Sequence, residues 1–193
     1  MASTSTEFAT SEQVRTLSPA RIAAIVAATV ALCISANLQI PIQPVPITMQ
    51  VLALDIIALT LSPRDTAAAV TSYLIIGALG APVFSDAMGG VAKLLGPTGG
   101  FIIGFVPSAT LASWLYRKLD ATKLPSVYAM TIALLASTTT LYVFGWAWLM
   151  VGARLTPQAA FAAGVTPFVV VDTLKAIIAA CAVSFCQLAR SAR

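Results

Sequence analysis

The feature that most constrains this chain is a series of long apolar runs, separated by Pro, Gly and short polar segments. An α-helix needs roughly 20 apolar residues to cross the hydrocarbon core of a bilayer, and most of the runs approach that length. Lipid cannot pair with backbone amides, so each run is expected to be helical. The pattern therefore predicts an all-α integral membrane protein with about six transmembrane helices.

The positions of Pro and Gly predict where the helices begin and end. We expect helices at about 20–38, 46–63, 65–80, 99–116, 126–151 and 167–188. They form one membrane domain at 19–190, with ordered external loops at 39–47, 80–99 and 152–166, after a polar cytoplasmic tail at 1–18. The second and third helices are shorter than a straight span requires. The tail lacks the basic start and apolar core of a signal peptide, so we expect it to belong to the mature chain.

The distribution of basic residues predicts the orientation in the membrane. With six spans, one side of the membrane holds both termini and the second and fourth loops. That side carries most of the basic residues, namely Arg15, Arg21, Arg64, Arg117, Lys118, Lys123, Arg190 and Arg193. The opposite loops hold Lys93 and Arg154. Since Lys and Arg gather in cytoplasmic loops, both termini are expected in the cytoplasm.

Composition narrows the functional classes. Charged residues make up 9% of the chain, against roughly 25% in soluble domains, so a water-soluble fold is excluded. The net charge of +4 is explained by topology and need not indicate nucleic acid. The chain has no His, and its Cys residues lie in apolar runs without metal-ligand spacing. It also has no glycine-rich phosphate loop, so energy for any transport is expected from a partner protein or a gradient.

Ionisable residues inside the apolar runs are the sharpest functional signal. Asp172 and Lys175, in PFVVVDTLKAIIAA, stand three residues apart on one helix face, so their side chains can meet. Charged groups at this depth are costly, and by default they face a cavity or a partner. Mutual neutralisation inside the helix bundle is the alternative. A third charge, Asp55 in VLALDIIALT, could pair with Lys175 across the bundle and leave Asp172 free for a ligand.

The segment 77–100 is rich in Gly and Pro and is too long for a simple connector, so we expect an ordered cap over an outward-facing cavity. At its end, GPTGG (96–100) allows two interpretations. Free backbone amides at the helix start could hold a carboxylate, with help from Lys93 or Thr98. Alternatively, Gly100 and Gly104 could let a neighbouring helix pack closely.

The first helix carries a smooth stripe of small residues. Ala23, Ala27 and Ala31 recur at every fourth position, with Ala24 and Ala28 beside them. Such a stripe lets another helix approach closely. The stripe alone leaves open whether that helix belongs to the same subunit or to a partner protein.

Several motifs occur together and in order. They are VPITMQ (45–50), SPR (62–64), GALGAPVFS (77–85), the Gly pair at 89–90, GPTGGFIIGF (96–105) and DTLK (172–175). From Ala20 to Leu188 the chain closely resembles BioY, the biotin-specific substrate-binding (S) subunit of energy-coupling factor (ECF) transporters. The resemblance implies a prokaryotic, multi-pass protein of the inner (plasma) membrane that captures biotin with high affinity for import. It implies no enzymatic activity and no cofactor.

The resemblance also implies site residues and partners. Biotin is expected near the external face, beneath the first and third external loops. The implied biotin-binding residues are Gln50, Tyr73, Phe84, Lys93, Gly99, Phe101, Asp172 and Lys175. The implied partners are a transmembrane coupling (T) subunit and two ATPase subunits, with Ala24 and Ala28 as docking residues. Asp55 departs from the family pattern, which is apolar or glycine-bearing at that place.

Two questions stay open at this level. Either end of biotin could meet the polar pair, but we expect the ureido head, because Asp172 can accept its N–H bonds and Lys175 can donate to its carbonyl. The carboxylate would then lie nearer the GPTGG turn. Other functional classes also remain: a membrane enzyme that uses Asp55, Asp172 and Lys175 as acid–base groups, or a self-contained vitamin carrier or channel without ATPase partners. We find neither a nucleophile or metal site for the first nor internal repeats for the second.

Overall fold

The structure is a computed structural model, and it describes residues 18–122 and 124–191. The expected polar tail, apart from Ser18, lies outside the described residues. In chain order the elements are α1 (Pro19–Asn37), β1 (Gln39–Ile40), β2 (Ile47–Thr48), α2 (Gln50–Thr60), α3 (Pro63–Ala78), η1 (Ser85–Ala87), α4 (Val91–Leu95), α5 (Gly99–Asp120), α6 (Ser126–Gly152), α7 (Pro157–Gly164) and α8 (Val169–Ser191).

The prediction of a mostly helical membrane protein is confirmed. In the described part of the chain, α1, α5, α6 and α8 are long and apolar enough to cross a membrane. The helix α2, with 11 residues, is apolar but shorter, and α3 has 16 residues. Both match the runs that the sequence predicts to be short. The expectation of six spans therefore stays a prediction, since four helices meet the length of a straight span among the described residues.

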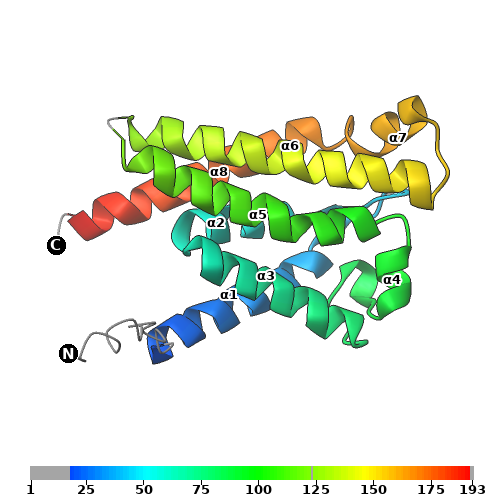
Figure 1. Cartoon of the computed structure of the whole chain (residues 1–193), viewed down its shortest axis with the longest axis horizontal. Coiled ribbons are helices and arrows are strands. Elements are labelled where there is room, and N and C mark those ends of the chain that lie inside the picture. Colours follow the sequence, from blue (N-terminus) through cyan, green and yellow to red (C-terminus); the bar gives the residue numbers. More distant parts are fainter. Residues whose placement is uncertain (1–17, 123, 192–193) are drawn as a thin grey trace, which may run out of the picture.

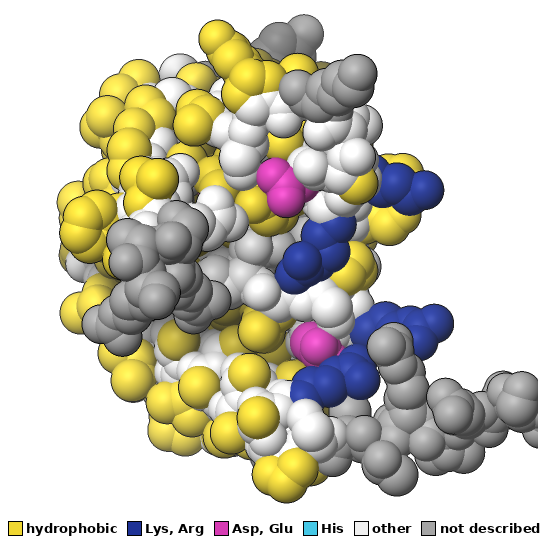
Figure 2. Space-filling model, turned by 90° about the vertical axis from the view of Figure 1, so that its left-hand side faces the viewer, with side chains coloured by type: hydrophobic (Ala, Val, Ile, Leu, Met, Phe, Trp, Pro, Cys, Tyr) yellow, Lys and Arg dark blue, Asp and Glu magenta, His cyan; other side chains and the backbone are white. Residues whose placement is uncertain are grey.

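The long helices lie side by side, and the connections cluster at the two ends of the bundle (Figure 1). One end carries the start of α1, the start of α3, the end of α5 and the end of α8. Figure 2 looks onto this end, where basic side chains gather beside acidic ones and hydrophobic side chains border them. The other end carries α4, α7 and the loops that close over the bundle.

Helices α5 and α6 pack closely because glycines face the neighbouring helix. A Cβ atom on Gly100 would lie 2.1 Å from the Cβ of Trp148 and 2.7 Å from the carbonyl oxygen of Phe144. A Cβ on Gly104 would lie 2.9 Å from the Cβ of Phe144. The indole of Trp148 also donates to the carbonyl of Gly96 at 2.9 Å, which holds the turn before α5. The interpretation of GPTGG as a close-packing segment is confirmed.

Helix boundaries differ from the prediction where prolines or extra turns intervene. The second helix begins at Gln50 rather than Pro46, because the proline-rich segment 39–48 forms a two-stranded hairpin with Gln39 opposite Thr48. Proline lacks an N–H and disfavours helix in the residue before it. The fourth of the predicted helices extends to Asp120, and the segment predicted as the loop 152–166 contains the short helix α7.

The small-residue stripe of α1 is divided between the core and the surface. Ala28 is 7% exposed and belongs to the core, and the neighbouring Thr29 hydroxyl donates to the carbonyl of Ala69 in α3 at 3.1 Å. Ala24 is half-buried, whereas Ala23 and Ala27 are exposed. Ala28 therefore packs inside the subunit in this arrangement, and the docking role expected for Ala24 and Ala28 stays a prediction.

Candidate functional site

A cavity lies where α2, α5, α6, α8 and the β1–β2 hairpin meet. Its walls are mainly apolar, with a few polar groups turned inward. The residues that line it are Val45, Pro46, Thr48, Gln50, Val51, Ser85, Thr98, Phe101, Ile102, Phe105, Leu141, Tyr142, Phe168, Asp172 and Lys175. An apolar cavity with few convergent polar groups is the usual form of a small-molecule site.

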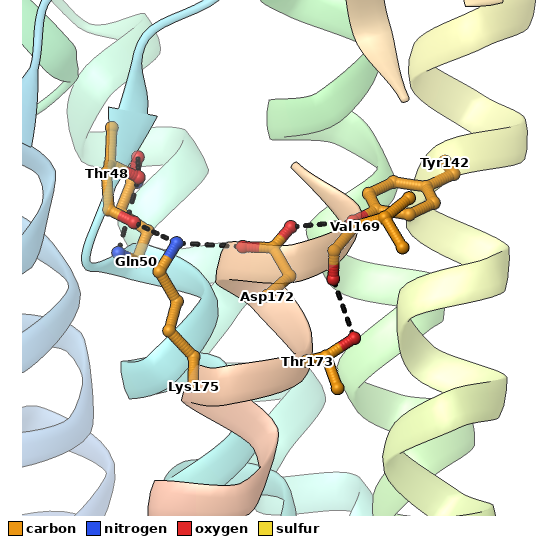
Figure 3. A network of polar contacts seen from close by, with 7 residues as sticks. All are labelled: Thr48, Gln50, Tyr142, Val169, Asp172, Thr173 and Lys175. Carbon is orange, nitrogen blue, oxygen red and sulfur yellow. Dashed lines mark hydrogen bonds and ion pairs between the residues drawn. The ribbon is translucent and has the colours of Figure 1, made fainter. Parts of the chain in front are cut away.

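The polar centre of the cavity is the pair predicted from the sequence. Asp172 and Lys175 lie one turn apart at the start of α8, and Lys175 Nζ is 2.8 Å from Asp172 Oδ1. The two residues are 2% and 4% exposed. Lys175 Nζ also donates to the carbonyl of Thr48 at 2.8 Å, and the hydroxyl of Tyr142 donates to Asp172 Oδ2 at 3.0 Å (Figure 3). Each charge is thus paired and hydrogen-bonded, as burial requires.

Gln50 anchors this centre to the rest of the bundle. Its side-chain oxygen accepts from the hydroxyl of Thr48 at 3.1 Å, and its side-chain nitrogen donates to the hydroxyl of Tyr73 at 2.7 Å. The ring of Tyr73 packs edge-on against Phe84, with centroids 5.4 Å apart. Phe84 fits there because Gly77 has no side chain: a Cβ on Gly77 would lie 2.1 Å from the ring. Tyr73 and Phe84 therefore support the wall and do not line the cavity.

The other predicted residues are divided between the cavity and its surroundings. Phe101 lines the cavity, lies against Gly145 of α6 and is 6.2 Å from the ring of Phe168. Gly99 lies outside the wall, directly after the lining residue Thr98, and a Cβ on it would lie 1.7 Å from the carbonyl oxygen of Leu94. Of the predicted set, the structure brings four residues to the cavity: Gln50, Phe101, Asp172 and Lys175.

Lys93 lines a second hollow, which we call the vestibule. Its walls come from the segment 41–46 and from residues 86–98, and it shares Pro46 and Thr98 with the cavity. The vestibule has a volume of about 300 Å³, whereas the cavity has about 50 Å³. Ligand pockets usually enclose about 300–1,000 Å³. The cavity in this conformation is therefore too small for a drug-sized ligand, whereas the vestibule reaches that volume.

Hydrogen bonds join the loops around the vestibule to each other. Asp86 accepts from the side-chain amide of Gln39 at 2.6 Å and from Lys93 Nζ at 3.2 Å. The backbone amide of Ala87 donates to the side chain of Asn37 at 3.1 Å. The Lys93 and Gln39 hydrogen bonds hold the pKa of Asp86 below its usual range. These contacts join the loop after α1 to the loop after α3, and we call the Gln39–Asp86–Lys93 set the latch.

The sequence does not point to Thr48, Ser85 or Tyr142 as site residues. Thr48 contributes a backbone carbonyl, which no side-chain pattern can reveal. Tyr142 lies 30 residues before its partner Asp172 and on another helix. A tyrosine within an apolar run carries no signal until the packing of α6 against α8 is known.

Asp55 does not make the pair that the sequence suggests. Lys175 pairs with Asp172, its neighbour on α8, and not with Asp55 across the bundle. Asp55 is 1% exposed, and its Oδ2 has no hydrogen-bond partner among the described residues. Within the same residues, no group of His, Cys, Asp and Glu side chains is arranged to hold a metal ion.

Comparisons with known proteins agree on one family. The sequence model of the BioY family matches residues 7–192. The biotin transporter BioY2 of Lactococcus lactis subsp. cremoris is 37% identical over 141 residues, covering 73% of this chain and 75% of that protein. The probable biotin transporter BioY of Pyrococcus horikoshii is 39% identical over 147 residues, covering 76% of this chain and 83% of that protein.

A solved structure shows the same fold. The S-component for biotin from an ECF-type ABC transporter aligns with a TM-score of 0.80 and covers 87% of this chain and 90% of that one. The sequence identity in that alignment is 24%, so the likeness concerns the fold alone.

Proposed function

This chain belongs to the BioY family, and we propose that it captures biotin for import as the substrate-binding subunit of an ECF-type transporter. The observation that carries the proposal is the buried Asp172–Lys175 pair, which faces a cavity of otherwise apolar walls. Relatives of 37% and 39% identity are named as biotin transporters. Because the family consists of transport proteins, we assign the pair to binding and not to acid–base catalysis.

The remaining hydrogen-bonding capacity of the pair suits the ureido head of biotin. A carboxylate has about four lone-pair sites, and Asp172 uses one on each oxygen for Lys175 and Tyr142. It can therefore accept ureido N–H bonds without losing its present partners. An ammonium has three donors, and Lys175 uses two, for Asp172 and the Thr48 carbonyl. Its third N–H can donate to the ureido carbonyl, and charge-assisted bonds of this kind are strong.

The carboxylate of biotin would then point toward the vestibule. Thr98 lies on the wall shared by the cavity and the vestibule, and its buried hydroxyl has no partner among the described residues. Lys93, on the vestibule wall, supplies a positive charge. We assign Thr98 and Lys93 to the carboxylate, and Phe101 with Phe168 to the rings and the aliphatic tail.

Entry of biotin requires the hairpin to move. The cavity volume of about 50 Å³ holds one or two water molecules and not a bicyclic vitamin. Val45, Pro46 and Thr48 of the hairpin segment form one wall of the cavity. In the proposed cycle, this segment opens outward to admit biotin and closes over it.

The proposed topology has six membrane helices, with α2 and α3 as short spans and both termini in the cytoplasm. The basic side chains at the end of the bundle that carries the termini support this orientation (Figure 2). The proposed partners are a T subunit and two ATPase subunits in the plasma membrane of a prokaryote. The exposed face of α1 around Ala23 and Ala27 is the docking surface that fits this proposal, with Ala24 at its border.

The direct test is equilibrium binding of labelled biotin to the detergent-purified chain, beside Asp172→Asn and Lys175→Met. Asp120→Asn is the matched control, because Asp120 is an exposed carboxylate at the end of α5. We expect tight binding by the native chain and the control, and loss in both site variants. A folded native chain that does not bind biotin would remove biotin as the ligand.

A further inference from the structure

Asp55 lies directly behind the biotin site, and a role for it in capture rests on the function proposed above. Val51 of α2 lines the cavity, and Asp55 follows it by four residues, so both occupy the same face of the helix one turn apart. Asp55 is 1% exposed, and its Oδ2 has no hydrogen-bond partner among the described residues. A buried carboxylate without a partner is costly, and such a group becomes neutral by taking up a proton.

The charged neighbours of Asp55 come from α8. Asp172 and Lys175 both interact electrostatically with Asp55. Asp55 also interacts electrostatically with the uncharged side chain of Tyr142 on α6. The other helices packed on α2 carry titratable groups as well. Helix α1 carries Cys33 and α3 carries Tyr73, which accepts from Gln50. The charged residues of these helices lie at the end of the bundle away from the cavity: Arg21 at the start of α1, Arg64 and Asp65 at the start of α3, and Arg117, Lys118 and Asp120, with Tyr116, near the end of α5.

The net charge of Asp55, Asp172 and Lys175 together decides whether the site attracts or repels an anionic ligand. With Asp55, Asp172 and Lys175 all ionised, these three buried side chains carry a net charge of −1. Biotin is also an anion near neutral pH, because an ordinary carboxyl group titrates at about 4.3. Two negative charges in a dry site repel each other. A proton on Asp55 leaves the neutral Asp172–Lys175 pair to receive the ligand.

We propose that Asp55 is a proton-binding site linked to capture: biotin binds better to the form with a protonated Asp55, so binding takes up a proton from solvent at any pH where Asp55 is ionised in the empty site. Biotin affinity then falls as pH rises, because the ionised form of Asp55 disfavours the anionic ligand. The repulsion between two negative charges about 10 Å apart, at an effective dielectric constant of about 20, lowers the affinity roughly tenfold. The neutral isostere Asp55→Asn imitates the protonated carboxyl and should bind biotin with an affinity independent of pH.

The test is calorimetric titration of the purified full-length chain with biotin between about pH 6 and pH 9, where the ligand stays ionised. Repeating it in two buffers of different ionisation heat gives the number of protons taken up per biotin. For the native chain we expect an affinity loss of roughly tenfold across this range, and therefore uptake of up to about half a proton per biotin. For Asp55→Asn we expect no proton uptake and constant affinity, and Asp120→Asn should behave like the native chain.

Each other outcome overturns the proposal. Absence of proton uptake by the native chain means that Asp55 keeps one protonation state, and this measurement needs no variant to fold. Equal pH dependence in the native chain and Asp55→Asn assigns the proton to another group. A dependence on Na⁺ at fixed pH, tested against choline, assigns the site to a metal cation. Failure of the native chain to bind biotin at any pH refutes the proposed function itself, which separates the two failures.

Discussion

Replacing both members of the buried pair tests whether Asp172 and Lys175 serve binding or only structure. In Lys175→Met, Asp172 keeps a hydrogen bond from Tyr142 but loses its countercharge at 2.8 Å. In Asp172→Asn, the ammonium of Lys175 keeps the Thr48 carbonyl but loses its carboxylate. Breaking a buried ion pair by removing one partner typically costs about 3–5 kcal/mol. For a chain of this size that corresponds to a fall in melting temperature of about 6–20 °C.

The double variant, Asp172→Asn with Lys175→Met, removes both charges of the pair. Replacement of a whole buried pair is often close to neutral for stability, so we expect its melting temperature to lie above those of both single variants. Biotin binding should not return, because the double variant can no longer offer charge-assisted bonds worth about 1.5–3 kcal/mol each. The assays are thermal unfolding in detergent, monitored by intrinsic fluorescence, and biotin binding. Both are made on the native chain, the two single variants and the double variant.

Two results would refute this reasoning. Additive losses of stability in the double variant would mean that the pair is not coupled, despite the 2.8 Å contact. Recovery of biotin binding along with stability would mean that Asp172 and Lys175 only hold α8 in place. Recovery of stability without recovery of biotin binding is the result that assigns the pair to the ligand.

Three further predictions concern the surroundings of the site. Gly100→Ala should destabilise the chain by about 1–3 kcal/mol, because the added Cβ would lie 2.1 Å from the Cβ of Trp148. Gly152→Ala is the control for the same melting assay and should be tolerated, because its Cβ would lie 3.2 Å from Nε1 of Trp148. Asp86→Asn should speed biotin dissociation up to about fivefold, since an exposed ion pair is worth about 0–1 kcal/mol. In the native chain the latch should persist at neutral pH, because the lowered pKa of Asp86 keeps its carboxylate ionised, and it should weaken only when acid protonates Asp86. The rate of biotin dissociation should also rise in concentrated salt, which screens the ion pair. Ala27→Leu, on the exposed face of α1, should leave biotin binding unchanged but reduce co-purification with the T and ATPase subunits.

The helical fold could be predicted because its main determinant is local. Apolar runs bounded by Pro and Gly predict helices whether or not their neighbours are known, and the short second and third runs did become the short helices α2 and α3. The hairpin at 39–48 could not be predicted as strand, since its two strands have 2 residues each, too few to show an alternating pattern. The division of the Ala stripe also depends on packing. Ala28 and Ala27 are neighbours in sequence, but of these two Ala28 is the one buried in the core.

The candidate site was predictable to the extent that burial of charge reveals function. Asp172 and Lys175 are conspicuous because their apolar run contains no other acidic or basic residue. The same rule indicated Asp55, but it could not tell which of the two carboxylates, Asp55 or Asp172, forms the ion pair with Lys175. The helical spacing of three residues decided that choice in favour of Asp172. Tyr142 and the Thr48 carbonyl complete the site through contacts between distant segments, which a single sequence does not encode in any local pattern.

In the cycle proposed above, opening of the hairpin also changes the hydrogen bonds of Lys175. Only Leu38 separates the end of α1 from β1, and Thr48, the last residue of β2, accepts a hydrogen bond from Lys175. An outward movement of the hairpin therefore enlarges the cavity and breaks this bond in one step. In the open state, water or a ligand carbonyl must accept from the N–H of Lys175 that Thr48 releases. In the closed loaded state proposed above, the Thr48 carbonyl and the ureido carbonyl each accept one N–H of the Lys175 ammonium. Closure restores the Thr48 contact, so this bond of the Lys175 ammonium favours the closed hairpin both with and without a ligand.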